Sequence, residues 1–377
     1  MKKICIVVSS ELTIKAFMLN HIRALSKRYD VTVVANTAEK EFFERFEIEA
    51  DVVPVHIERK PSLLRDVMAV WYLYRLFRQK NFDLIYSVTP KAGLLAVLAG
   101  SMARVPVRIH TFTGQVWVTR SGLMRFILKT ADRILGLFAT HVLVDSFSQR
   151  NFLLLENVIP SWKSSVLSRG SISGVDTNRF SPNRKIRDII RKRHSVADDH
   201  IIFLYLGRLN RDKGILDLAQ AFVKVAVSHP DAHLFIVGPD EENLLPTVRN
   251  ISTIASDRLH YAGYTEMPEQ YLACADVFCL PSYREGFGTV ILEAAAAGLP
   301  AIGSRIYGIT DAIEAGSTGL LHDAGNVNQL TDCMEQCLVN PALRKNMAEA
   351  ARTRTLRDFP QEKVTTALLD FFQHILQ

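Results

Sequence analysis

Short apolar runs alternate with longer amphipathic segments along most of the chain. The runs have the length of buried strands, whereas segments such as residues 14–26 and 65–78 repeat apolar residues at helical spacing. This alternation predicts α/β structure in which helices cover a parallel sheet. The expected strands are residues 4–8, 31–35, 84–87, 107–111 and 141–144 in the first half, and 201–206, 233–237, 259–261, 277–280 and 301–303 in the second.

The repetition of this pattern predicts two similar lobes. A length of 377 residues also exceeds the roughly 100 to 200 residues of one ordinary domain. Gly, Pro and Ser cluster at residues 170–184, so we expect one Rossmann-like lobe at 1–175 and a second at 176–360. Residues 361–377 are expected to form a helix that packs back on the first lobe. Two doubly wound lobes that face a central cleft would bind ligands at their strand ends.

Charge is distributed unevenly between the two halves. Residues 1–170 hold 24 Lys and Arg against 14 Asp and Glu, whereas the remainder holds 21 against 25. A basic first half suggests an anionic surface or acceptor. The longest apolar run, residues 92–103, is too short to span a membrane, and the first residues lead directly into a strand without a cleavage region. We therefore expect a cytoplasmic protein.

The strongest motif lies at residues 281–300, where a strand is followed by a glycine-bearing loop and then by a helix. Backbone N–H groups of Phe287, Gly288 and Thr289 lie at the expected helix start, where the helix dipole favours a phosphate. Glu285 in the loop and Glu293 on the helix flank this position. Both carboxylates are placed to accept hydrogen bonds from sugar hydroxyls.

A second motif at residues 203–214 combines a strand, a glycine and a basic loop. Arg208 and Lys213 in this loop can clamp a diphosphate and offset the charge that develops on it as a glycosidic bond breaks. The acidic segment at residues 240–242 follows another strand and is interpreted as a solvated loop.

Together these stretches resemble the retaining glycosyltransferases of family four, which have the two-lobed GT-B fold, and in particular the bacterial enzymes of surface-polysaccharide and lipid-linked oligosaccharide synthesis. The family pattern of two glutamates separated by seven residues is matched by Glu285 and Glu293. The other matches, in chain order, are Gly174, Val175, Asp176 and Phe180, then Gly207, Arg208, Lys213 and Gly214, then Gly263 and Tyr264, and finally Gly319.

The resemblance implies a nucleotide diphosphate sugar in the second lobe. It implies Glu293 on the ribose, Arg208 and Lys213 on the diphosphate, and Glu285 with the backbone of residues 287–289 on the sugar. The turn at Gly263 and Tyr264 belongs to the same donor site. His110, at the end of its strand, matches a histidine that the family places beside the donor sugar. The catalytic set is therefore expected to be Glu285, His110, Arg208 and Lys213.

The resemblance also implies a same-face displacement without a protein nucleophile. No Asp-x-Asp motif precedes the site, so no metal and no cofactor are expected. The expected reaction moves a hexose or N-acetylhexosamine, from a uridine diphosphate donor by family frequency, in the synthesis of a bacterial glycan such as a capsule or O-antigen. Two alternatives are a sugar-nucleotide epimerase of the same fold and a noncatalytic sugar-nucleotide-binding protein. No nucleic-acid-binding signature is present, so no nucleic acid partner is expected.

Residues 119–138 predict a basic amphipathic helix in the first lobe, with Arg120, Arg125, Lys129 and Arg133 at intervals of four to five residues. Such a helix can lie on the anionic inner face of a cell membrane, and it can equally pack on the sheet with its charges in water. The candidate acceptor residues are Lys91, Gly114 and Trp117. We expect a lipid-linked saccharide, carried on polyprenyl diphosphate, as the acceptor.

Overall fold

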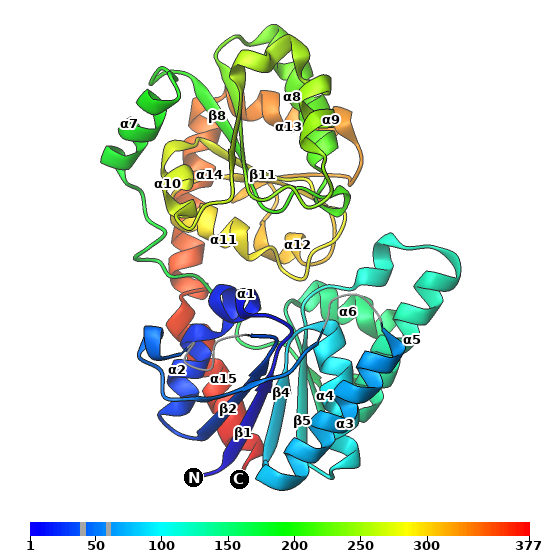
Figure 1. Cartoon of the computed structure of the whole chain (residues 1–377). Helices are drawn as coiled ribbons and strands as arrows, with labels where there is room; N and C mark the ends of the chain where they lie inside the picture. Colours follow the sequence, from blue (N-terminus) through cyan, green and yellow to red (C-terminus); the bar gives the residue numbers. More distant parts are fainter. Residues whose placement is uncertain (38–42, 58–61) are drawn as a thin grey trace. The chain divides into compact units, whose positions relative to one another are not determined.

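The computed structural model describes residues 1–37, 43–57 and 62–377 of the chain (Figure 1). It contains two compact units. The first comprises Met1–Ser173 together with Gln361–Gln377, and the second comprises Gly174–Pro360. Within the described ranges, no helix combines the length and the apolar character needed to cross a membrane.

The first unit is built on a parallel sheet of seven strands in the order β3-β2-β1-β4-β5-β6-β7. After β3 the chain returns to the middle of the sheet, where β4 pairs in parallel with the side of β1 that β2 leaves free. The strands are β1 (Lys3–Val7), β2 (Asp30–Ala35), β3 (Asp51–Pro54), β4 (Leu84–Ser87), β5 (Val107–Phe112), β6 (His141–Val144) and β7 (Ser164–Ser165).

Helices cover both faces of this sheet (Figure 1). Side chains alternate along β1, so that Ile4 and Ile6 join one core, whereas Cys5 and Val7 join another on the opposite face. The first core includes residues of α2 and α15, and the second includes residues of α3 and α4. The helices are α1 (Glu11–Thr13), α2 (Leu19–Ser26), α3 (Leu63–Lys80), α4 (Pro90–Met102), α5 (Gly122–Phe138), α6 (Phe147–Leu155) and α15 (Gln361–Ile375).

The second unit repeats the architecture with six parallel strands in the order β10-β9-β8-β11-β12-β13 and a single large core. The strands are β8 (Ile201–Leu206), β9 (Ala232–Val237), β10 (Leu259–Gly263), β11 (Val277–Leu280), β12 (Ala301–Ser304) and β13 (Gly319–His322). The helices are α7 (Arg184–Arg193), α8 (Ile215–Ser228), α9 (Leu245–Ile251), α10 (Pro268–Cys274), α11 (Thr289–Ala296), α12 (Ile309–Ala312), α13 (Val327–Val339) and α14 (Pro341–Asp358).

Each sheet has a switch point, at which the strand order reverses: between β1 and β4 in the first unit, and between β8 and β11 in the second. Open parallel sheets bind ligands beyond the carboxyl ends of the strands at such points. The loops of the two predicted motifs, residues 203–214 and 281–300, follow β8 and β11. The fold therefore brings them to the same edge of one sheet, and the predicted α/β class with two parallel-sheet lobes is confirmed.

Two local expectations differ from the structure. The segment expected to form one helix at residues 14–26 begins with a π-helical turn, Ile14–Met18, before α2. The expected helix at residues 119–138 begins only at Gly122, because Arg120 is extended, with φ of −115° and ψ of 159°. Arg120 is therefore not on the helix that carries the other basic residues.

Candidate functional site

The loops that follow β8 and β11 are joined by several direct contacts. The backbone N–H of Tyr283 donates to the carbonyl oxygen of Asp212 at 2.8 Å, and Arg284 forms an ion pair with the Asp212 carboxylate at 3.1 Å. Gly214 has φ of +69°, and a β-carbon at this position would lie 1.9 Å from the carbonyl oxygen of Pro281. The two loops therefore touch backbone to backbone, and only glycine fits at the contact.

Lys213 and Glu285, one from each loop, form an ion pair at this junction. The side chains retain only 19% and 12% of their exposure, and the Ser282 hydroxyl donates to the same carboxylate at 2.9 Å. Two residues predicted to bind one ligand therefore lie in direct contact, although they are 72 positions apart in the chain. A bound diphosphate would compete with Glu285 for the ammonium group of Lys213.

Arg208, the other predicted diphosphate ligand, is held by an acidic partner. Its Nη1 lies 3.1 and 2.8 Å from the two carboxylate oxygens of Glu241. The segment at residues 240–242 was expected to be a solvated loop, but it makes specific contacts. Besides the pairing of Glu241, Asp240 accepts hydrogen bonds from the backbone N–H groups of Leu244 and Leu245 at 2.9 Å. A signal in the sequence could have indicated this pairing: the loop after one strand is basic, and the loop after the next strand, which carries Glu241, is acidic.

α11 begins at Thr289, directly after the loop that carries Glu285. Gly288 is the N-cap residue, with φ of +81°, and no side chain caps the helix. The Phe287 side chain is buried and packs edge-on against Phe359, at 5.4 Å between ring centroids. Phe287 can therefore serve a ligand only through its backbone, and the first N–H groups of α11, including that of Thr289, lack partners within the helix.

Glu293 lies on the second turn of α11 and is partly exposed. Burial raises the pKa of Glu293 to about 7; nearby Glu269 also raises it, while Arg179 opposes the shift. A carboxyl group with this pKa titrates near neutral pH, and hydrogen bonds from ribose hydroxyls would favour its ionised form. Such perturbed carboxyl groups are typical of functional sites.

Gly263 is the last residue of β10 and Tyr264 follows it, at the same edge of the sheet. Gly263 has φ of +70° and open space where a β-carbon would stand, and its carbonyl oxygen accepts a hydrogen bond from Gly238 N–H at 2.7 Å. The Tyr264 side chain is 63% exposed. The structure therefore places every predicted donor residue on the carboxyl edge of one sheet.

His110 lies in the first unit, near the end of β5, and is completely buried. Its Nδ1 lies 2.9 Å from the Ser87 hydroxyl, whereas its Nε2 has no hydrogen-bond partner in the described part of the chain. Burial lowers the pKa of His110 to about 3, so the imidazole is neutral at pH 7. A β-carbon on Gly93 would lie 2.4 Å from this ring, which explains why a glycine stands there.

The loop expected to receive an acceptor is instead part of the core. Gly114 is buried, and Trp117 is only 1% exposed. The Trp117 indole donates to Asp132 at 2.8 Å and stacks on Phe152. These contacts give Trp117 a packing role, because its polar atom is already satisfied and both ends of the side chain are covered.

The predicted basic residues are also largely engaged. Lys91 forms an ion pair with Asp66 of α3 at 2.6 Å. Lys129 pairs with Glu156, and Arg125 lies 3.7 Å from the same carboxylate. Arg133 donates at 3.1 Å to the carbonyl oxygens of residues 156 and 157. These side chains tie helices together, which within the described residues favours the packed alternative for residues 119–138 over the membrane-facing one.

Comparison with known proteins agrees with this geometry. Residues 14–170 match the glycosyl transferase 4-like domain, and residues 186–354 match the glycosyl transferases of group 1. The chain is a GT-B glycosyltransferase of group 1 with a family-4-like first domain, as its motifs predicted. The enzyme class therefore favours glycosyl transfer over the epimerase and the noncatalytic binding protein.

Among particular relatives, the chain is 26% identical over 354 residues to the capsular polysaccharide biosynthesis glycosyltransferase CapM of Staphylococcus aureus, covering 93% of this chain and 91% of CapM. It is 25% identical over 319 residues, 83% of this chain and 81% of the relative, to an Escherichia coli galactosyltransferase named for UDP-galactose and a diphosphoundecaprenol-linked N-acetylglucosamine. The fold matches that of Anabaena HepE in complex with UDP and glucose, with a TM-score of 0.82, 18% identity and coverage of 99% of this chain and 100% of HepE.

Proposed function

We propose that this glycosyltransferase moves a hexose or N-acetylhexosamine, with retention and without a metal, from a uridine diphosphate sugar to a saccharide on polyprenyl diphosphate. The observation that carries the proposal is the Lys213 and Glu285 pair at the switch point of the second sheet. When a donor binds there, the basic group can contact its diphosphate and the acidic group can contact its sugar. The names of relatives that act on lipid-linked diphosphate acceptors support the choice of acceptor.

In this mechanism Lys213 exchanges its contact with Glu285 for one with the diphosphate, and Arg208 does the same with Glu241. Both cations then offset the charge that grows on the leaving diphosphate as its bond to the sugar breaks. Glu285, once released, accepts hydrogen bonds from sugar hydroxyls. A leaving phosphate oxygen takes the proton from the acceptor hydroxyl, whose oxygen bonds to the sugar on the same face.

His110 has a supporting role in this proposal. Its imidazole is neutral, and Nε2 has no hydrogen-bond partner among the described residues, so this nitrogen can share a hydrogen bond with a sugar hydroxyl without adding charge to the site. His110→Ala should therefore lower transfer while leaving donor affinity nearly unchanged. Equal transfer by His110→Ala and the parent would remove His110 from the proposed catalytic set.

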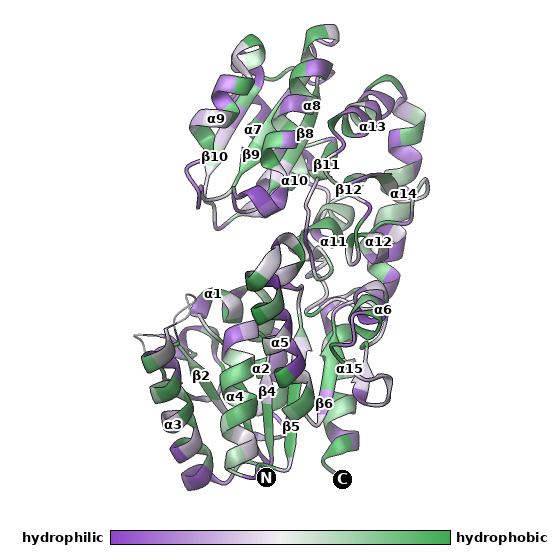
Figure 2. Cartoon of the chain, turned by 90° about the vertical axis from the view of Figure 1, so that its right-hand side faces the viewer, coloured by the Kyte–Doolittle hydropathy of each residue, from purple (hydrophilic) through white to green (hydrophobic). Residues whose placement is uncertain are grey.

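The proposed acceptor requires contact with a membrane surface, and the described structure favours an apolar contact over the basic one. The exposed side of α5 carries Leu123 and Phe126, which are 74% and 65% exposed. α3 exposes Met68 and Trp71, at 68% and 57%. The intervening helix α4 contacts both α3 and α5, and the apolar turns of these helices are green in Figure 2. Large apolar side chains on neighbouring helices are typical of membrane-interface contacts.

This surface can be tested separately from the donor site. Leu123→Ser with Phe126→Ser should reduce sedimentation with vesicles that contain anionic lipid, and should slow transfer to a lipid-linked acceptor. Arg120→Gln is the matched control for charge on the same segment, since Arg120 is exposed and precedes the helix. Unchanged sedimentation of the double variant would exclude α5 as the membrane contact.

The function itself is tested by incubating the protein with labelled sugar nucleotides and a bacterial lipid extract. Transfer of label to the lipid fraction from a uridine diphosphate sugar is expected. An isomerised donor would instead identify an epimerase, and binding without any conversion would identify a noncatalytic protein. Either result would overturn the proposed reaction.

A further inference from the structure

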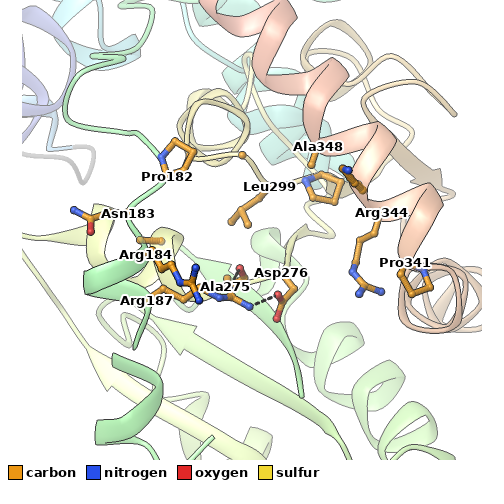
Figure 3. A pocket seen from close by; sticks show the side chains of 15 residues that line it. Pro182, Asn183, Arg184, Arg187, Ala275, Asp276, Leu299, Pro341, Arg344 and Ala348 are labelled. Atoms are coloured by element: carbon orange, nitrogen blue, oxygen red, sulfur yellow. Dashed lines mark hydrogen bonds and ion pairs between the residues drawn. The ribbon is translucent and has the colours of Figure 1, made fainter. Parts of the chain in front are cut away.

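The second unit contains a cavity of about 390 Å³ at the opposite edge of its sheet from the donor residues (Figure 3). Asp276, directly before β11, and Pro300, directly before β12, line this cavity. It therefore lies at the amino ends of these strands, whereas Lys213 and Glu285 follow the carboxyl ends of β8 and β11. Nothing in the proposed transfer reaction uses it.

Four cationic side chains line the cavity against one carboxylate. The cations are Arg184, Arg187, Arg344 and Lys345, and the carboxylate is Asp276. Asp276 is already compensated: it pairs with Arg187 at 2.7 Å and with Arg191 at 2.6 Å, and it accepts a hydrogen bond from Ile202 N–H at 2.8 Å. The cavity consequently has a surplus of positive charge that its own carboxylate does not offset.

Several donor groups of these cations remain uncommitted. Arg184 is exposed and has no ion-pair or hydrogen-bond partner in the described ranges. Arg344 engages the carbonyl oxygens of Cys337 and Leu338 through Nη1 alone. Lys345 is 77% exposed, and its ion-pair partner, Glu349, is 3.9 Å away. An anion could therefore be bound without breaking an internal contact.

The backbone adds to this field. α7 begins at Arg184 and α14 begins at Pro341, so two helices of 10 and 18 residues start at the cavity wall. The amino end of a helix carries a partial positive charge. The end of α11 contributes an opposite partial charge near Gly298, which two helix starts and four cationic side chains outweigh.

Most of the remaining wall is apolar, with Leu299, Ala273 and Ala348 among its residues, and Asn183 is its polar member. Figure 3 shows Ala348 on the same side of the cavity as Arg344 and Pro341, and Leu299 between Arg184 and Arg344. A volume of about 390 Å³ falls within the range of small-molecule pockets. We propose that this cavity binds a phosphomonoester of a small organic molecule, with its phosphate on the arginine and lysine side chains and its organic part on the apolar wall.

Isothermal titration of the full-length protein with glucose 6-phosphate, inorganic phosphate and glucose tests this site. Saturable binding is expected for glucose 6-phosphate, weaker binding for phosphate and none for glucose. Arg184→Glu with Lys345→Glu should weaken glucose 6-phosphate binding at least tenfold, and both side chains are exposed, so the fold should tolerate the change. Ala348→Trp should block the cavity without altering its charge.

Two controls separate this site from general charge and from the donor site. Lys192→Glu with Arg193→Glu makes the same charge change on the exposed part of α7 that does not line the cavity, and should leave the affinity unchanged. Lys213→Ala, in the donor site, should also leave it unchanged. The proposal is overturned if glucose 6-phosphate shows no saturable binding, if both double variants weaken binding equally, or if only Lys213→Ala removes it.

Discussion

Gly214 provides the sharpest test of how the donor loops are held together. In Gly214→Ala, the new β-carbon would lie 1.9 Å from the Pro281 carbonyl oxygen, and real β-carbons essentially never approach closer than 3.0 Å. The loops must separate by about 1 Å, which costs roughly 1–3 kcal/mol in a packed region. The left-handed backbone conformation of the new alanine adds about 1–2 kcal/mol. We expect a total loss of about 2–5 kcal/mol in the second unit.

Gly263→Ala is the matched control, because Gly263 has nearly the same φ, +70° against +69°, but no atom within 4 Å of the added carbon. It should lose only the conformational part, about 1–2 kcal/mol. The difference between the two variants isolates the contact with Pro281. Turnover of Gly214→Ala should also fall by about 100-fold, because a displacement of 1 Å at reacting groups has effects of that size.

The placement of tryptophan makes the measurement selective. The three tryptophans, Trp71, Trp117 and Trp162, all lie in the first unit. Urea unfolding followed by circular dichroism should therefore shift in Gly214→Ala, while the transition followed by tryptophan fluorescence stays in place. Equal stability of Gly214→Ala and Gly263→Ala would refute the inferred backbone contact.

Three further predictions concern ionisable groups. Lys213→Ala and Glu285→Ala should each lower turnover by about 100- to 1000-fold. Each should also lose roughly 1–3 kcal/mol of stability, because each leaves a largely buried partner unpaired. Combining Lys213→Ala with Glu285→Gln should restore stability but not turnover. Donor affinity, measured by calorimetry, should rise between pH 6 and 8 as Glu293 ionises from its raised pKa of about 7, and Glu293→Gln should abolish this rise. Burial lowers the pKa of His233 to about 4, so His233 should contribute a loss of about 1–3 kcal/mol from the second unit as the pH falls from 6.5 to 4 and protons bind preferentially to the unfolded chain. Urea titrations of His233→Gln should show a smaller loss than the parent, because burial also lowers the pKa of His260 to about 4 and His260 remains.

The sequence predicted the sheets well where strands are buried on both faces. β8 and β11 were expected at the residues where they occur, because continuous apolar runs of four to six residues leave little choice of structure. β3 was missed because it is a short edge strand with exposed Asp51 and Pro54, which resembles a loop. The start of α5 could have been found from Ser121, a residue type that favours the N-cap position.

The sequence predicted which residues lie together at one edge of the second sheet, but not which protein groups hold them there. Motif spacing located Lys213 and Glu285 separately, yet their contact depends on how two loops cross a sheet edge. The same holds for Arg208 and Glu241. Such pairings follow from strand order, which the apolar pattern of a single sequence does not determine.

The basic excess of the first half shows why a charge count does not identify a binding surface. Helical spacing correctly places Arg125, Lys129 and Arg133 on one side of α5, but the next helix brings Glu156 and its backbone carbonyl groups to that side. Each of these cations then has a protein partner, so its attraction to a lipid headgroup is offset by the contact it must give up. The side of α5 that remains exposed carries Leu123 and Phe126. If the protein binds membranes through this helix, the binding should therefore depend on buried apolar area more than on salt, since screening over roughly 10 Å at 0.1 M weakens charge contacts but not apolar ones.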